Sequence, residues 1–346
     1  MHVVTSSNSN FMINIFKFSL IGILLTTAVG VNAQHLSSTN KKILDKKEDS
    51  LKNAADSMVN GIAPAKRFRS DSILVRTLVR ALQINNSFYY PFDSLLAVSK
   101  LYPPDSSFRI FTWQLKKDEY MYIQKGAIQM RTPAGELKLI PLFDASMFTA
   151  KPLDSVRTRS TWIGAIYYKI IQKSFNNKKY YTLLGFDDFS VSSNRKWMEV
   201  LSFNEKGEPV FGGPFISFKE DTVKRATLQR FNIEYKKDAR TTFNYNPELD
   251  MIIYDHLISE TDEPEKKDTY IPDGDFEGFK WKNGQWVHVD KVFNFSLKEG
   301  EAPVEEALRN KEGTIDETKL IEQSLKNEQR GDKKPVVPPV KKKIKP

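Results

Sequence analysis

Cysteine is absent from this 346-residue chain, and histidine occurs only four times. A chain without cysteine has no disulfides, no thiolate metal ligands, no cysteine nucleophile and no cysteine to carry a lipid. Beyond the first 33 residues the histidines are His35, His256 and His288. These three histidines are far apart in the sequence, which argues against a zinc site built from them.

Several sequence motifs of common enzymes are also missing. The chain has no G-x-S-x-G elbow, no phosphate-binding glycine-rich loop, no dinucleotide fingerprint and no H-E-x-x-H pair. Hydrolysis of glycosides by two carboxylates needs none of these motifs, because it depends only on the separation of two acids. A carboxylate-dependent hydrolase of envelope glycans therefore stays an alternative.

Residues 1–33 are predicted to be a signal peptide. Lys17 precedes the apolar run FSLIGILLTTAVGV, which ends in the small-x-small sequence VNA at residues 31–33. The run is too short for a membrane anchor. We expect an exported protein, periplasmic or secreted, which is not a lipoprotein because cysteine is absent.

The net charge of +9 is unevenly distributed. Residues 66–297 carry +5, which is too diffuse to require a polyanion, so no nucleic-acid partner is expected. Residues 331–346 contain six Lys, one Asp and four Pro and are predicted to be a disordered tail. This tail is predicted either to bind an anionic envelope polymer or membrane surface, or only to keep the chain soluble.

Helical patterns are confined to the two ends of the chain. Residues 34–65 are polar and predict a weak helix or a flexible spacer, and residues 298–330 predict a helical extension. Apolar residues at three- and four-residue spacing predict a helix over residues 70–85. A second short helix is expected to begin at Pro91 and to end before Pro103.

The region between these ends is typical of β-structure. About eleven or twelve strands are predicted, with hairpin-length connections and no helices of crossover length, which favours an antiparallel meander. The clearest hairpin joins residues 279–281 to 286–289 through Asn283-Gly284, a pair that suits a type I′ turn. The fold is therefore expected to be mainly β, as a sandwich, a barrel or an incomplete propeller-like arrangement within one domain of residues 66–297.

One stretch is predicted to lie at the centre of a sheet. Residues 180–186 are apolar with little alternation, so both faces of this strand should be covered. Asp187 and Asp188 follow directly, and Gly185 is a candidate for a β-bulge that aims these carboxylates.

Four polar residues are candidate catalytic groups. Asp187 and Asp188 end the central strand, while Asp255 and His256 lie in another apolar strand, MIIYDHL. If the two strands are close, a carboxylate and an imidazole share a cleft suited to general acid–base chemistry. Asp255 and His256 cannot pair with each other, because adjacent strand residues face opposite sides. A hydrogen-bonded structural histidine is the competing interpretation.

An acidic segment, DGDFEG at residues 273–278, is a candidate calcium loop. Asp273, Asp275 and Glu277 supply oxygen ligands at alternate positions. The similarity to a calcium loop ends at its twelfth position, which is Gly284 instead of Glu. A solvated turn is the competing interpretation, and no other cofactor is expected.

Trp281 and Trp286 flank the last hairpin and are candidate ligand-stacking residues. Packing in the core is the competing role for both, because burial of an aromatic side chain contributes roughly 1.5 to 3 kcal/mol.

Three stretches carry a resemblance to other proteins: YYTLLGFDD, MIIYDHL and YIPDGDFEGFKWKNGQWV. Through them residues 162–292 resemble a group of exported bacterial proteins of unknown function. The resemblance implies export and one β-rich unit, and it assigns no role to any residue. The sequence as a whole favours a non-enzymatic envelope or periplasmic protein with a binding or structural role.

Overall fold

The computed structural model describes residues 35–293, 318–319 and 321–322. The chain divides into two compact units, residues 1–290 and 291–346. The described part of the first unit consists of two α-helices followed by fifteen strands. Of the second unit, residues 318–319 and 321–322 are helical and lie within the predicted helical extension.

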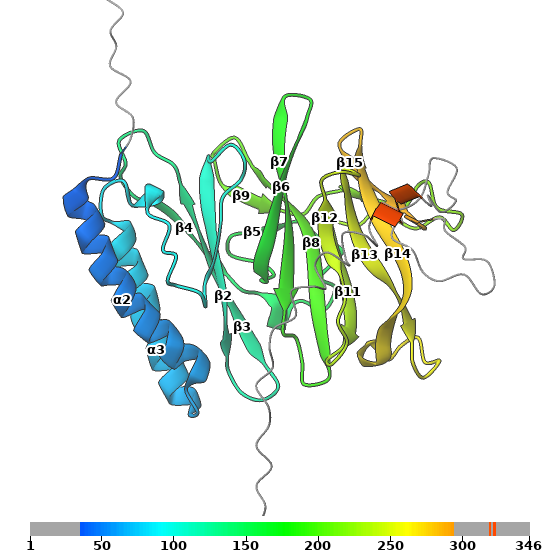
Figure 1. Cartoon of the computed structure of the whole chain (residues 1–346), viewed down its shortest axis with the longest axis horizontal. Helices are drawn as coiled ribbons and strands as arrows, with labels where there is room; N and C mark the ends of the chain where they lie inside the picture. The colour runs from blue at the N-terminus through cyan, green and yellow to red at the C-terminus, as the bar shows by residue number, and fades with distance from the viewer. Residues whose placement is uncertain (1–34, 294–317, 320, 323–346) are drawn as a thin grey trace, which may run out of the picture. The chain divides into compact units, whose positions relative to one another are not determined.

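The two helices lie side by side and cover the first sheet (Figure 1). They are α2, Ser38–Asn60, and α3, Pro64–Leu82. The Ser37 hydroxyl caps α2 by accepting the Asn40 amide at 3.1 Å. Helix α3 has proline at its start, where the missing N–H costs nothing. The apolar faces of both helices join one core cluster with residues of β2.

Fifteen strands form three sheets within the described residues. Sheet 1 has the order β1-β2-β3-β4 and consists of Ser99–Leu101, Phe108–Lys116, Tyr122–Met130 and Lys138–Phe143. Sheet 2 has the order β5-β9-β8-β7-β6, with β11 also paired to β8; in chain order its strands are Arg157–Thr158, Ile166–Phe175, Lys178–Asp187, Ser193–Phe203, Pro209–Phe211 and Arg230–Lys236. Sheet 3 has the order β10-β15-β14-β13-β12; in chain order its strands are Ile216–Ser217, Phe243–Asn246, Met251–Ser259, Tyr270–Lys282 and Gln285–Val289.

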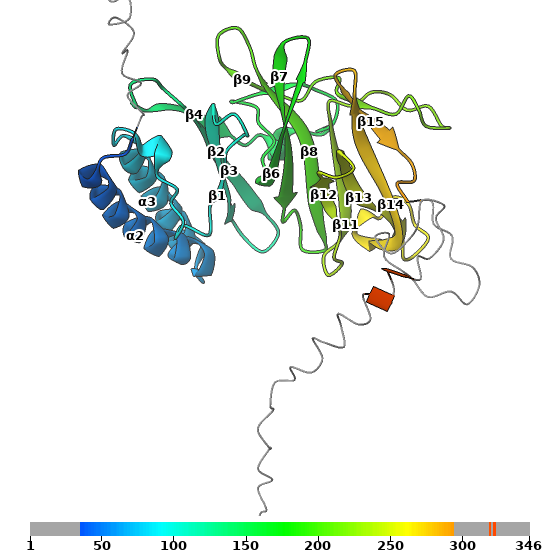
Figure 2. The same ribbon diagram turned by 45° about the horizontal axis from the view of Figure 1, so that its top comes forward.

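Sheet 2 is covered on both faces (Figure 2). On one face, Tyr181 and Leu183 of β7 pack in a cluster with residues of sheet 1. On the other face, Leu184 packs in a cluster with residues of sheet 3. The continuous apolar run of β7 follows from this double coverage, because neither face of the strand meets solvent.

The structure confirms a mainly β, antiparallel fold with helices near the N-terminus. The sheets are open, so the barrel alternative is not adopted. Strands β10 and β15 form a short parallel pair, which the hairpin pattern did not predict. Asn283 and Gly284 both have positive φ, as the predicted hairpin turn requires.

One helix prediction is wrong, and an open one is decided in favour of a helix. Residues 91–98 form turns, not a helix, and Phe92 has a φ of 56°, which right-handed helix excludes. Residues 34–65, predicted as a weak helix or a spacer, contain the long helix α2, whose Leu44 and Leu51 are fully buried. The predicted signal peptide, residues 1–33, and the predicted tail, residues 331–346, lie outside the described residues.

A hydrogen bond between Thr182 of sheet 2 and Trp286 of sheet 3 can be removed to test how these two sheets pack. Both side chains are fully buried, and the indole Nε1–H donates to the Thr182 hydroxyl at 2.8 Å. Thr182→Val keeps the shape and leaves the indole N–H without an acceptor, so it should lower the free energy of unfolding by about 1–3 kcal/mol. In a Trp286→Phe background the same substitution should cost little, as a urea-denaturation double-mutant cycle can measure. If Thr182→Val lowers the free energy of unfolding equally in wild type and in Trp286→Phe, the hydrogen bond does not stabilise the fold.

Candidate functional site

Asp187 is the last residue of β7 and lies between sheets 1 and 2. Its side chain is 9% exposed, and its Oδ1 accepts a hydrogen bond from Gln124 Nε2 at 2.7 Å. Gln124 belongs to β3, so the bond joins two sheets across 63 residues of sequence. No ion pair to Asp187 occurs within the described residues. This carboxyl is therefore buried without a cationic partner of its own.

Contacts of both its backbone and its side chain position Gln124. Its backbone N–H donates to Asp144 Oδ2 at 2.9 Å, just beyond the end of β4. A Cβ on Gly164 would lie 2.1 Å from Gln124 Cβ, so only glycine at that position lets the Gln124 side chain reach Asp187. The Gln124 Oε1 atom is buried and has no hydrogen-bond partner among the described residues. The site therefore holds an unused acceptor beside the carboxyl.

The environment raises the pKa of Asp187 to about 7. Burial is the main cause, because it disfavours the charged form. The positive charge of Arg195 lowers this pKa, the negative charge of Asp144 raises it, and Trp197 and Gln124 lower it through their polar groups. Near neutral pH, Asp187 is therefore poised between its neutral and charged forms.

The neighbouring charges are already compensated. Arg195, the cross-strand neighbour of Asp187, donates through Nε to Glu234 at 2.8 Å and stacks on Phe189. Asp188 forms an ion pair with Lys237. These pairs leave Asp187 as the carboxyl at this end of β7 whose charge is not matched.

A cavity of about 290 Å³ opens at Asp187 and Gln124. Its wall combines aromatic and aliphatic side chains from β3, β8 and the surrounding loops: Tyr120, Met121, Tyr122, Met147, Pro152, Ile163, Phe189 and Trp197. Two of the lining side chains are strongly exposed, Tyr120 at 76% and Met147 at 52%. An apolar pocket with a few convergent polar groups is the usual form of a small-molecule site.

The four candidate catalytic residues are not brought together. Asp188 pairs with Lys237, and Asp255 is buried and accepts the backbone N–H of Thr242. The half-exposed His256 bonds through Nδ1 to Asp273 at 2.7 Å. Within the described residues no hydrogen bond or ion pair links any two of the four. Asp255 and His256 have different partners and do not bond to each other, and His256 lies where the β13–β14 register shifts.

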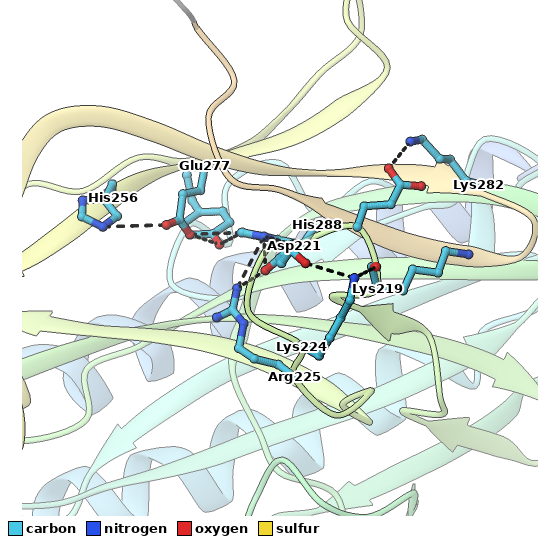
Figure 3. A network of polar contacts seen from close by, with 10 residues as sticks. Lys219, Asp221, Lys224, Arg225, His256, Glu277, Lys282 and His288 are labelled. Atoms are coloured by element: carbon cyan, nitrogen blue, oxygen red, sulfur yellow. Dashed lines mark hydrogen bonds and ion pairs between the residues drawn. The ribbon is translucent and has the colours of Figure 1, made fainter.

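A second polar group, the carboxylate–imidazole cluster, contains Asp221, His256, Glu277 and His288 (Figure 3). Tyr254, which bonds to His288, and Asp273, which bonds to His256, complete the cluster. His288 Nδ1 lies 2.9 Å from Asp221 Oδ1, and Nε2 lies 3.1 Å from Glu277 Oε2. Burial alone would lower the pKa of His288, but hydrogen bonds to the two carboxylates outweigh it and raise this pKa. Asp221 is also paired with Arg225 at 2.6 Å.

This cluster joins a loop to a sheet. Asp221 lies in the loop after β10, whereas Glu277 and His288 lie on β14 and β15. The His288 side chain is fully enclosed and both ring nitrogens are bonded within the protein. The cluster is thus suited to fastening the loop to sheet 3 and offers no access to a ligand at His288.

The candidate calcium ligands occupy a strand and not a loop, so the loop prediction for residues 273–278 is wrong. Residues 273–275 lie opposite His256 where the β13–β14 register shifts, and Gly274 has a φ of 97°. Asp273 is bonded to His256, and Glu277 is bonded to Tyr254 and His288. In the part of the chain that the structure describes, no three His, Asp or Glu side chains, Asp275 included, are grouped to hold a metal ion.

The two candidate stacking residues belong to the core. Trp286 is fully buried, so its ring is not accessible to a ligand. Trp281 packs against Trp286 at 5.3 Å and against Tyr180 at 6.1 Å between ring centroids. The aromatic side chains that line the cavity at Asp187 are instead Tyr120, Tyr122, Phe189 and Trp197.

Sequence reasoning identified Asp187 and missed its partners. Gln124 carries no local signal, because its role depends on contact between two sheets. The β-bulge predicted at Gly185 is not on β7: the extra residue lies in the partner strand β6, between Tyr167 and Lys169, and the β7–β8 register is regular through Asp187. A Cβ on Gly185 would lie 2.6 Å from Ala165 Cβ, so glycine here permits close packing of the strands.

Asp187→Asn tests the desolvation of this carboxyl. A raised pKa means that the folded state holds the proton more tightly than the unfolded state, so stability falls as pH rises from about 4 to about 7. Asn does not ionise, so the variant does not lose stability in this way. Its free energy of unfolding should exceed that of wild type by about 2–4 kcal/mol at pH 8 and should equal it at pH 4. Urea denaturation at both pH values measures the difference.

Asp188→Asn is the matched control, because it removes the carboxylate that already pairs with Lys237. It should bring no gain in stability at pH 8. If Asp187→Asn also fails to raise the free energy of unfolding at pH 8, burial does not raise the pKa of Asp187.

Comparison with known proteins adds no assignment to this geometry. No helix among the described residues has the length and apolar character needed to cross a membrane. No protein-family model, curated protein or solved structure matches the chain.

Proposed function

We propose that this protein is an exported, non-enzymatic binding protein whose ligand occupies the cavity at Asp187. The observation that carries the proposal is a buried carboxyl without a cationic partner, next to an unused amide oxygen, in a mostly apolar cavity of about 290 Å³. A buried polar group without partners costs stability, so a site that keeps two such groups is suited to a ligand that satisfies them.

Binding is favoured over hydrolysis by the number of acids in the cavity. Carboxylate-dependent hydrolysis of glycosides uses two acids on opposite sides of the scissile bond. Asp187 is the only Asp or Glu among the residues that line this cavity, and Asp188 and Asp255 are engaged elsewhere. One acid suits recognition of a ligand better than it suits this two-acid reaction.

Export to the periplasm or the medium is part of the proposal. It is supported by the apolar run that ends at VNA in residues 31–33 and by the resemblance to exported proteins. The absence of cysteine supports a protein that is not lipid-anchored, and the Lys-rich residues 331–346 support contact with an anionic envelope polymer or membrane surface.

A pair of tryptophan substitutions tests whether the cavity binds ligands. Met147 lines the cavity and is 52% exposed, whereas its neighbour Phe148 is more exposed and does not line it. In a thermal-shift screen of small organic molecules, ligands should raise the melting temperature of wild type and of Phe148→Trp, but not of Met147→Trp, which fills the mouth.

Shifts of equal size in Met147→Trp and wild type place the ligand elsewhere and contradict the proposal. The hydrolase alternative is tested in parallel with fluorogenic glycosides and envelope glycans. Turnover by wild type that is abolished in Asp187→Asn establishes the alternative and overturns the non-enzymatic assignment.

A further inference from the structure

Two neighbouring polar groups of the cavity, the Asp187 carboxyl and Gln124 Oε1, are acceptors, while Trp197 Nε1–H and Arg195 add donors to the wall. The Asp187 carboxyl receives one hydrogen bond from Gln124, and Gln124 Oε1 receives none within the described residues. A ligand that satisfies both must bring N–H or O–H donors to the same spot. An ammonium group has three donors and no acceptor, so it matches this arrangement better than a carboxylate, a phosphate or an ether.

The charges around the cavity also favour a cation. Asp187 and Asp144 form no ion pair within the described residues, and Asp144 is satisfied by the backbone N–H groups of Gln124 and Ser146. Arg195 also lines the cavity, and Glu234 accepts from two of its nitrogens and so compensates its charge. The uncompensated charge that faces the ligand is therefore negative whenever Asp187 is ionised.

The walls suit the rest of such a ligand. Tyr120, Tyr122 and Trp197 present aromatic rings, which attract organic cations and pack against apolar groups. The volume of about 290 Å³ lies at the lower end of ligand sites, which fits a molecule with one ring or a short chain.

We infer that the ligand is a small organic amine, bound with its ammonium group against Asp187 and Gln124 Oε1 and its apolar part against Tyr120, Tyr122 and Trp197. This inference rests on the proposed function and adds the chemical class of the ligand. The exposed side chain of Met147, which lines the cavity, provides an apolar approach for such an amphiphilic molecule.

Benzylamine and benzyl alcohol form a matched pair of probes. They share a ring and differ in the ammonium group. Calorimetric titration at pH 8 should show that wild type binds the amine at least tenfold more tightly than the alcohol, because only the amine supplies a charge-assisted bond to Asp187. Asp187→Asn should bind both alike. Asp154→Asn, which removes an exposed acid outside the cavity lining, should keep the preference.

Binding of the amine should also displace a proton. The amine favours the ionised form of Asp187, whose pKa is about 7 in the free protein, so wild type at pH 6 should release protons on binding and at pH 9 should not. Titration in buffers of different ionisation enthalpy measures this release, and Asp187→Asn should show none at pH 6.

Equal affinity for the amine and the alcohol overturns the amine assignment while leaving a ligand site in place. Binding of neither probe also overturns it. The comparison of Met147→Trp with Phe148→Trp then decides separately whether the cavity binds ligands at all.

Discussion

Coverage of sheet 2 on both faces is the constraint on which the rest of this structure depends. Strands β7 and β8 contact sheet 1 on one side and sheet 3 on the other, so polar side chains on them must find partners inside the protein. Thr182 meets Trp286, and Glu199 meets Tyr167 and Arg230. The Thr182–Trp286 bond joins sheet 2 to sheet 3, whereas the contacts of Glu199 join strands within sheet 2. Asp187 departs from this pattern, because among the described residues it forms no ion pair and its hydrogen bond comes from the neutral amide of Gln124.

That departure connects the fold to the proposed function. At the end of β7 the layers separate enough to leave a cavity, while the carboxyl stays largely shielded from water. Burial without a counterion makes the charged form costly, and a donor-bearing ligand relieves that cost. The same physical cause therefore destabilises the free protein and favours binding. By contrast, His288 is matched by two carboxylates and acts within the structure.

Local patterns predicted much of the fold and only part of the site. The run at residues 180–186 and the Asn283-Gly284 turn encode their structures within a few residues, so both were predictable. Helix α2 was underestimated because residues 34–65 are mostly polar, and the burial of its few apolar residues depends on packing against α3 and β2. Asp187 was recognised as a strand-end acid. Its link to Gln124 depends on packing between two sheets, which the sequence pattern does not contain.

The ionisation of Asp187 in the free protein tests the central claim most directly. Carbon-13 NMR of aspartate carboxyl groups, with Asp187→Asn used to assign the resonance, follows this titration residue by residue. The account predicts a pKa of about 7, because burial without an ion-pair partner outweighs the bond from Gln124. A pKa near the ordinary value of about 4 would contradict it, since the carboxyl would then be solvated or already matched by a charge.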